Sequence, residues 1–243
     1  MKDILQDLVA HTHALGFINL VKVTSDSEGT KFESMAEDRS VILTAETSSK
    51  MVDIDGVFGM TNLDKLALHL KNPEYDKDSK IEVVEAERNG NTIPTHIHFE
   101  NAAGDFQNDY RFMNAEIINE KLKTVKFKGV NWDVTLEPSV ASIQRMKLQS
   151  AAHSEETTFN VKTDNGDLVF SFGDHSTHAG KFVFQPGVEG ELKHAWAWPV
   201  AAIQAILSLN GDKKMMIADA GALQITVNSG QAEYNYILPA QSK

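Results

Sequence analysis

The sequence predicts an α+β protein built from two similar domains, each with two helices packed on antiparallel sheets. Three observations support this prediction. Short segments rich in β-branched and aromatic residues fill most of the chain, and several alternate with a period of two. Four other segments have helical spacing, and the order of helix, strands, helix, strands occurs twice. With 243 residues, the chain suits two domains of ordinary size.

Nine segments are expected to form strands, and turn pairs separate several of them. Asn89-Gly90 and Asn165-Gly166 are the strongest hairpin signals, because Asn and Gly readily adopt the positive φ angles of a two-residue turn. Ser229-Gly230 is a weaker signal of the same kind. The expected strands are 18–23, 41–46, 80–87, 95–100, 158–163, 168–172, 181–185, 214–219 and 223–227.

Four helices are expected, and most have a signal at one end. Asn62 is placed as the N-cap of the second helix. Pro138 stands at the entry of the third helix, and Pro199 stands near the start of the fourth, which Gly211 ends. The expected helices are 2–15, 62–72, 139–154 and 198–210.

The third helix has a predicted apolar side and a predicted wet side. Val140, Ile143 and Met146 form the apolar arc, and Lys147 lies close to that arc by helical phase. The residues expected on the opposite, solvent-facing side are Ser142, Arg145 and Gln149.

The two domains are expected to span residues 1–114 and 131–243. Residues 115–130 are charged and show no clear period over their first part, so they are predicted to form an interdomain connector. Trp196 and Trp198 precede an apolar helix, and they are predicted to belong to the core rather than to a base-stacking site.

The composition argues against several classes of protein. Cysteine is absent, which excludes a disulfide framework and a thiolate metal site. The N-terminal stretch carries acid within its apolar run, so it is not expected to be a signal peptide. The chain contains no run of about 18 apolar residues, so no membrane-spanning helix is predicted. These features permit a cytoplasmic location. The sequence contains no nucleophile elbow, no phosphate-binding glycine loop and no helical Glu/His motif, so no motif predicts an enzyme.

Charge is distributed unevenly along the chain. The net charge of −11 argues against a simple basic nucleic-acid-binding protein. The four expected helices nevertheless carry +2 and the remainder carries −13, because acid is scarce in the helices and absent from residues 139–154. Chance can produce this pattern in four short helices. The alternative interpretation is that the helices share one surface that meets a polyanion.

Histidines raise a different possibility. His96 and His98 lie on one face of an expected strand, as at the beginning of the metal site in a cupin-type β-barrel enzyme. Glu100 follows too soon to be the carboxylate of such a site, and neither residues 173–178 nor His194 belong to a convincing partner motif. The favoured interpretation is that these are surface strand positions without a metal. A cupin-like metal-dependent enzyme is the alternative.

Five segments, taken in their order and spacing, resemble those of the trimeric DNA sliding clamps. This family of eukaryotes, archaea and T-even-like phages includes proliferating cell nuclear antigen. The segments are ESMAEDRSVILTAE (33–46), TNLDKLALHLKN (61–72), NDYRFMN (108–114), EPSVASIQRMKLQSAAHS (137–154) and YNYILPA (234–240). The short N-terminus, the connector and the uncharged fourth helix differ from cellular clamps and are more similar to a phage clamp.

The resemblance implies a ring-forming processivity factor for DNA replication, with no enzymatic activity and no cofactor. Three chains would close head to tail, and duplex DNA would pass through a hole lined by helices. The ring would tether a DNA polymerase and be opened by an ATP-driven clamp loader, in the cytoplasm of the host cell if the source is a phage. A trimeric phage structural β-protein without a role on DNA is a further alternative.

Three surfaces follow from the resemblance and from the patterns above. The DNA-facing residues would be Lys2, His13, Lys65, His69, Lys71, Arg145, Lys147 and Gln149. The pocket for a partner peptide would be lined by Met35, Val41, Phe127, Ile237, Leu238 and Pro239. The subunit interface would pair edge strands near 109–114 and 179–185, because exposed aromatics on an edge strand favour association. These aromatics are Tyr110, Phe112, Phe182 and Phe184.

Overall fold

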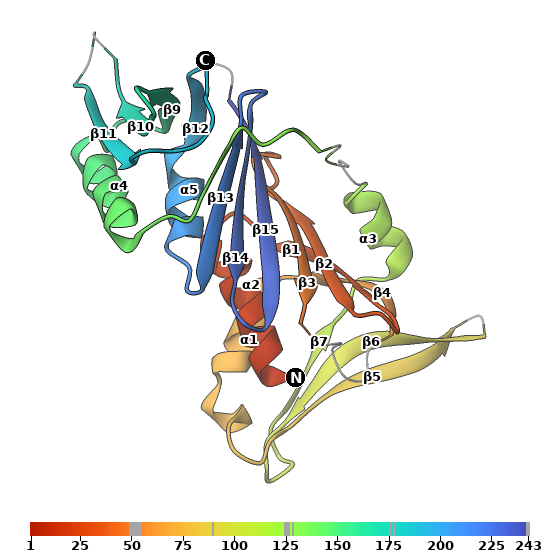
Figure 1. Ribbon diagram of the computed structural model, residues 1–243. Helices are drawn as coiled ribbons and strands as arrows, with labels where there is room; N and C mark the ends of the chain where they lie inside the picture. The colour runs from red at the N-terminus through yellow and green to blue at the C-terminus, as the bar shows by residue number, and fades with distance from the viewer. Residues whose placement is uncertain are drawn as a thin grey trace. The chain divides into compact units, whose positions relative to one another are not determined.

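The computed structural model of the chain consists of helices and antiparallel strands (Figure 1). It describes residues 1–48, 55–88, 90–123, 127, 129–174, 176 and 178–241. Several positions named in the sequence predictions lie outside the described residues. These are Asn89 of the first hairpin turn, His175 and Thr177 of the histidine-rich segment, and connector residues 124–126 and 128.

The chain divides into two compact units. The first comprises Met1–Val125 with Ser229–Tyr234, and the second comprises Lys126–Asn228 with Asn235–Lys243. In the first unit, the backbone N–H of Ser48 donates to the carbonyl of Gln231 (2.9 Å), which ties the short C-terminal piece to it. One strand, β15, therefore supplies residues to both units.

The first unit begins with a helix and four strands, followed by a second helix and three more strands. The first four strands are ordered β4-β1-β2-β3, and the last three form a separate sheet ordered β5-β6-β7. The elements are α1 (Lys2–Ala10), η1 (His13–Leu15), β1 (Leu20–Ser25), β2 (Thr30–Met35), β3 (Ile42–Thr47), β4 (Gly56–Thr61), α2 (Leu63–Lys71), η2 (Pro73–Tyr75), β5 (Lys80–Arg88), β6 (Asn91–Glu100), β7 (Gln107–Arg111) and α3 (Ala115–Lys121).

The second unit repeats this order after one short strand. Its first four long strands are ordered β11-β10-β9-β12, and the remaining strands are ordered β15-β14-β13-β8. The elements are β8 (Val134–Leu136), α4 (Val140–Ala152), β9 (Thr158–Asp164), β10 (Asp167–Phe172), β11 (Gly180–Gln185), β12 (Trp196–Pro199), α5 (Val200–Leu207), β13 (Asp212–Ala218), β14 (Ala222–Asn228) and β15 (Ala232–Pro239).

Both units thus run helix, four strands, helix, three strands, with the same neighbours in each four-stranded arrangement. The prediction of an α+β fold with two similar halves is confirmed. Alternation of side chains builds the core of each half: Val21 and Val23 of β1 are buried, as are Phe170 and Phe172 of β10. Trp198 is fully buried, as predicted.

The expected connector holds a helix that the sequence analysis missed. Asn114 caps α3, because its side-chain oxygen accepts from the N–H of Ile117 (3.0 Å). Ile118 is buried against β4, and a Cβ at Gly59 would lie only 2.9 Å from its side chain. Glycine at position 59 therefore permits this close packing. A single buried position in seven residues leaves no period for sequence analysis to detect.

Other boundaries also differ from the predictions. The first helix ends at Ala10, and the turn over His13–Leu15 closes at Gly16, whose φ is 85°. Strands β2, β4, β8 and β12 were not predicted, and β12 ends where the fourth helix was expected to begin. β2 buries the polar Thr30 and Ser34, β4 contains two glycines, and β8 has three residues, so none of these three shows the expected hydrophobic alternation.

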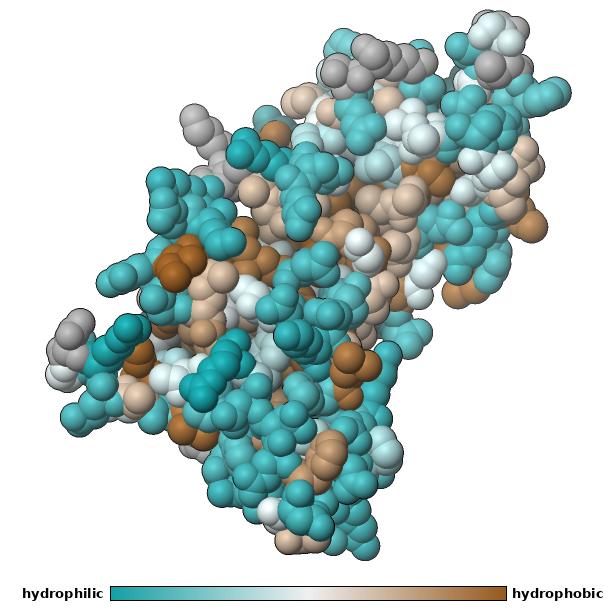
Figure 2. Space-filling view, turned by 180° about the vertical axis from the view of Figure 1, so that it is seen from behind, coloured by the Kyte–Doolittle hydropathy of each residue, from teal (hydrophilic) through white to brown (hydrophobic). Residues whose placement is uncertain are grey.

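Hydrophilic residues cover most of the surface in Figure 2, and hydrophobic residues appear in separate groups. Scattered groups of this kind are normal on folded proteins. Among the described residues, no helix is long and apolar enough to cross a membrane.

Candidate nucleic-acid interface

In the first unit, α1 and α2 pack against each other and leave a face of mixed charge. The amide of Gln6 donates to the carbonyl of Leu70 (3.5 Å). The apolar residues buried beneath the two helices are Leu5, Leu8, Val9, Leu63, Leu66, Ala67 and Leu70. The residues that stay exposed are Asp3, Gln6, Ala10, Asp64, Lys65, Leu68 and Lys71. This face therefore carries two acids and two bases.

Lys2, predicted to face DNA, is already engaged within the first unit. Its ammonium group donates to the carbonyl of Tyr75 (2.6 Å) and lies 3.8 Å from the carboxylate of Asp76. These contacts hold the start of α1 against η2. Lys2 therefore has a structural role, and its charge is partly offset.

The two histidines predicted for the same face are also involved in local contacts. His69 lies against the rings of Tyr75 and Phe99. Burial, and then the nearby charge of Lys65, hold the pKa of His69 below its usual value, so the ring is neutral near pH 7. His13 is half-exposed, and its ring lies 3.4 Å from the side-chain oxygen of Asn19.

In the second unit, α4 packs on β11 by an unexpected side. The hydroxyl of Ser139 accepts from the N–H of Ser142 and so caps the helix (3.0 Å). Ser142 is 7% exposed, because its own hydroxyl donates to the carbonyl of Phe184 (2.6 Å), whereas Val140 is 78% exposed. The predicted wet position of Ser142 and buried position of Val140 are therefore wrong. Only Met146 of the apolar arc is fully buried.

Arg145 is the exposed cation of α4. Its guanidinium lies over the ring of Phe182 on β11, 5.5 Å from the ring centre. Lys147 and Gln149 are half-buried. The Gln149 side chain covers Gly180, where an added Cβ would lie 2.9 Å from its oxygen. Arg145 is therefore more available to a ligand than the other two predicted residues.

The second helix of this unit, α5, carries no charge. Its apolar side is buried, and Gln204 accepts from the hydroxyl of Ser150 on α4 (2.9 Å). The exposed residues of α4 and α5 are Val140, Ala141, Gln144, Arg145, Leu148, Ala151, Ala152 and Ala201. This helical face has no exposed acid and a single exposed base, Arg145.

The residues predicted for a partner pocket differ in accessibility. Val41, Ile237 and Leu238 are buried, the last completely, whereas Pro239 is exposed. Met35 and Val41 belong to the first unit, and the others belong to the second. Within the second unit, Phe127 stacks on Trp132 with ring centres 6.0 Å apart. Leu238 is therefore a core residue, not an exposed anchor as the sequence analysis assumed.

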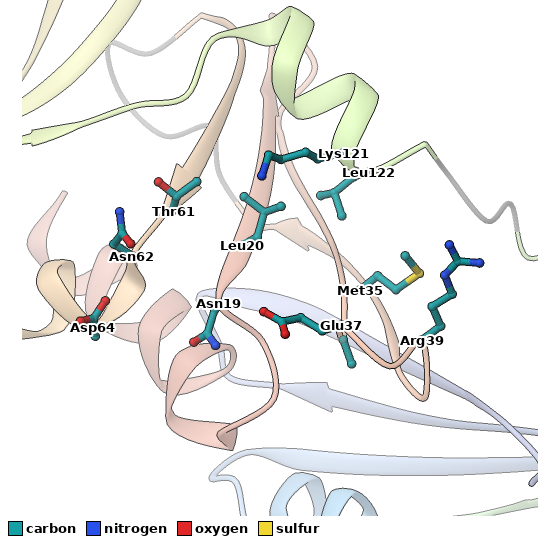
Figure 3. Close-up of a pocket in the computed structure, with 11 residues that line it drawn as sticks. Asn19, Leu20, Met35, Glu37, Arg39, Thr61, Asn62, Asp64, Lys121 and Leu122 are labelled. Atoms are coloured by element: carbon teal, nitrogen blue, oxygen red, sulfur yellow. The ribbon is translucent and has the colours of Figure 1, made fainter.

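Met35 lines a cavity of the first unit that is about 690 Å³ in volume. Figure 3 shows Met35, Glu37 and Arg39 at the turn after β2, with Lys121 and Leu122 reaching toward the cavity from the end of α3. Arg39 adopts a φ of 60° in this turn, and its backbone N–H donates to the carbonyl of Ala36 (2.9 Å). The other lining residues are Asn19, Leu20, Ala36, Thr61, Asn62 and Asp64. Of these residues only Met35 was predicted for a pocket, because one side of the cavity is formed by the end of the unpredicted helix α3.

The predicted interface strands are the outer strands of their sheets, but the aromatics point inward. Tyr110 of β7 is 4% exposed, and its hydroxyl donates to the carbonyl of Thr61 (2.6 Å). Phe112 stacks on Phe58 (4.2 Å). Phe182 and Phe184 of β11 are buried against Phe170. The assumption that these aromatics are exposed is wrong, because Tyr110, Phe182 and Phe184 belong to the cores of their own units and Phe112 is half-buried.

The histidines of β6 are paired with carboxylates. His98 contacts both Asp109 (2.9 Å) and Glu100 (3.3 Å), and His194 contacts Asp219 (2.9 Å). Within the described part of the chain, no three His, Cys, Asp or Glu residues are arranged to hold a metal. The described strands form open sheets. The cupin-like enzyme and the phage structural protein gain no support from these findings.

No family model and no curated protein matches this sequence. Solved structures do match the fold. PCNA from Thermococcus kodakaraensis superposes with a TM-score of 0.67 at 14% identity, covering 99% of this chain and 97% of that one. A. fulgidus PCNA, solved with the C-terminal region of FEN-1 bound, gives 0.68 at 10% identity and covers 100% and 95%. The chain therefore has, over its whole length, the duplicated fold of the PCNA sliding clamps.

Proposed function

We propose that this protein is a DNA polymerase sliding clamp. Three copies would close into a ring around duplex DNA, tether the replicative polymerase and be opened by a clamp loader ATPase. The observation that carries this proposal is the match to PCNA over nearly the full length of both chains. The clamp would have no catalytic site and would act in the cytoplasm, that of the host cell if the gene is viral.

The helical faces support a role in weak, sequence-independent contact with DNA. A sliding ring needs a surface that attracts phosphate without holding it tightly, because specific base contacts would stop its movement. Arg145, Lys65 and Lys71 are the exposed cations of these helices. We assign phosphate contact to these three residues first. Lys147 would contribute less, and Lys2 and His69 would act mainly within the fold.

The cavity beside α3 supports a site for a partner on the first unit. Met35 and Leu122 supply apolar surface, and Glu37, Arg39 and Lys121 supply charges at its edge. A. fulgidus PCNA binds the C-terminal region of FEN-1, which shows that a protein with this fold can accept a peptide segment. A polymerase peptide would use Met35 and Leu122 as contacts, so Leu122→Ala should weaken peptide binding and leave the oligomeric state unchanged.

Two sheet edges support head-to-tail assembly. β7 ends the β5-β6-β7 sheet and β11 ends the four-stranded sheet of the second unit. Unpaired N–H and C=O groups on an outer strand are a template for pairing with another chain. Pairing β7 of one copy with β11 of the next would be a heterologous contact, which closes into a ring if the rotation permits. The buried aromatics would support these strands from behind.

Two measurements test the proposal. Sedimentation equilibrium should give three times the chain mass of 26.9 kDa. Clamp loader and ATP should load the protein onto a nicked circular DNA, and linearising the circle should release it. A stable monomer, or equal retention on circular and linear DNA, would contradict a topological ring.

A further inference from the structure

A cluster of charged and titratable groups lies on one face of the β5-β6-β7 sheet. On β6, Ile97 and Phe99 are buried, so the alternate residue His98 faces the other way. His98 Nδ1 lies 2.9 Å from Asp109 Oδ1 on β7, and His98 Nε2 lies 3.3 Å from Glu100 Oε2. The imidazole therefore joins two carboxylates and connects the middle strand to the outer one.

Other charges on the same three strands converge on Asp109. His96 Nε2 lies 3.5 Å from the same Asp109 oxygen, and Arg111 Nη2 lies 3.4 Å from the other. The register places His98 opposite Asp109, and His96 opposite Arg111. On β5, Glu82 is the register partner of His98 and forms an ion pair with Lys80 (2.7 Å). The cluster thus contains three carboxylates, two permanent cations and two histidines.

The pKa values of the two histidines are shifted in opposite directions by their surroundings. The hydrogen bond to Asp109 raises the pKa of His98, although burial opposes it. Burial lowers the pKa of His96 more than Asp109 raises it. His98 therefore takes up a proton first as the pH falls, and its imidazolium lies between Asp109 and Glu100.

We propose that protonation of His98 strengthens the β7 edge for pairing with a second copy of this chain. This inference rests on the proposed ring and names a regulator of its interface. Asp109 and Arg111 are outward-facing side chains of the outer strand. A protonated His98 holds Asp109 and so fixes this strand to its sheet. When His98 loses its proton, the negative charges of Asp109 and Glu100 are less well neutralised, and β7 is held less firmly against β6.

The direction of the effect follows from linkage. The hydrogen bond to Asp109 already raises the pKa of His98 in the single folded chain above its ordinary value of about 6.5. Pairing with a second copy must therefore hold Asp109 more firmly against His98 and raise this pKa further, so that protonation stabilises the assembled state at low pH. The stabilisation is lost as the pH rises through the raised value. One proton per interface changes the association constant by at most about tenfold per pH unit. The ring should therefore dissociate more readily at pH 8 than at pH 6.

Sedimentation equilibrium between pH 6 and pH 8 tests this proposal on the full chain. In the wild type, the trimer should weaken as the pH rises, and His98→Gln should flatten the dependence. His194→Gln is the matched control, because it removes the histidine of the other 2.9 Å His–Asp pair, in the second unit. It should behave as the wild type. Circular dichroism would verify that each variant is folded.

A second measurement does not depend on the variants at position 98. NMR titration should place the pKa of His98 above 6.5 in the wild type and lower it in Asp109→Asn. A wild-type chain that is monomeric at every pH would overturn the ring and the proposal together. A trimer with the same pH dependence in His98→Gln, or a wild-type His98 that titrates below 6.5, would overturn the proton link and leave the ring intact.

Discussion

The helix pairs α1/α2 and α4/α5 hold the same positions in the order of their units, yet they present different surfaces. The first pair exposes two acids and two bases, and one further lysine is engaged by a backbone carbonyl. The second pair exposes four alanines, Val140, Leu148, Gln144 and Arg145, with no acid. The shared topology therefore determines how each pair is buried and leaves the charge of the outer face free to vary.

The largest expected effect is on the free energy of unfolding, and it tests whether a buried side chain contributes equally to stability in the two helix pairs. Leu66 of α2 and Ile206 of α5 are both fully buried. Leu66→Ala and Ile206→Ala should each lower the free energy of unfolding by about 2–5 kcal/mol, because each leaves a cavity. Leu68→Ala and Leu148→Ala on the same helix pairs are the controls. These side chains are 69% and 71% exposed, so the change should stay within about 0.5 kcal/mol.

A smaller effect should distinguish the first pair through Asp7, a partly buried acid. The carboxylate of Asp7 on α1 accepts from Tyr234 (2.8 Å) and Ser229 (2.9 Å), and His11 lies 3.3 Å away. Burial opposes the charged form, but these hydrogen bonds outweigh it and hold the pKa of Asp7 below its usual value. The stabilisation is therefore present above pH 3.8 and lost as the pH falls through the lower, folded value.

Asp7→Asn should lower the free energy of unfolding by about 1–3 kcal/mol at pH 6, because it disturbs a partly buried carboxylate that accepts two hydrogen bonds. Denaturant unfolding at pH 6 and pH 3 would measure this difference, which should shrink at the lower pH. An equal loss at both values would mean that the ionised carboxylate does not stabilise the first unit.

Arg145→Glu should test the acid-free face of the second pair. Charge reversal would place a carboxylate on that face in every copy of the proposed ring, so loading and retention on circular DNA should fall while the fold and oligomeric mass stay unchanged. Lys162→Glu, on an exposed position of β9, is the control with the same charge change. Normal retention by Arg145→Glu would mean that the absence of acid in this segment is chance.

The smallest effect should come from single neutral substitutions in the first pair. Lys65→Ala should reduce the salt dependence of DNA binding, with a slope change of up to about 1 per chain that contacts a phosphate. Lys2→Ala should change the slope less, because Tyr75 and Asp76 already engage its ammonium group. Equal changes in the two variants would contradict this structural role of Lys2.

The sequence predicted features that depend on local signals and missed features that depend on distant contacts. Asn62, Pro199 and the apolar spacing placed α2 within one residue and α5 within three residues at each end, because end signals and periodicity are local properties. The helix α3 and its cavity were missed, because one buried isoleucine against Gly59 stabilises α3 and that contact is distant in sequence. Leu238 and Tyr110 were placed at surfaces, although distant packing buries both.

By itself, the sequence determined the α+β class, the duplicated order of elements and the scarcity of acid in the helices. Those features depend on local periodicity and composition. Only the tertiary structure decided which side of α4 is wet. On α4, the carbonyl of Phe184 accepts from Ser142 and draws that polar residue inward, while the apolar Val140 stays outside. The acceptor is a backbone carbonyl on a distant strand, and the helical phase of α4 cannot predict that contact.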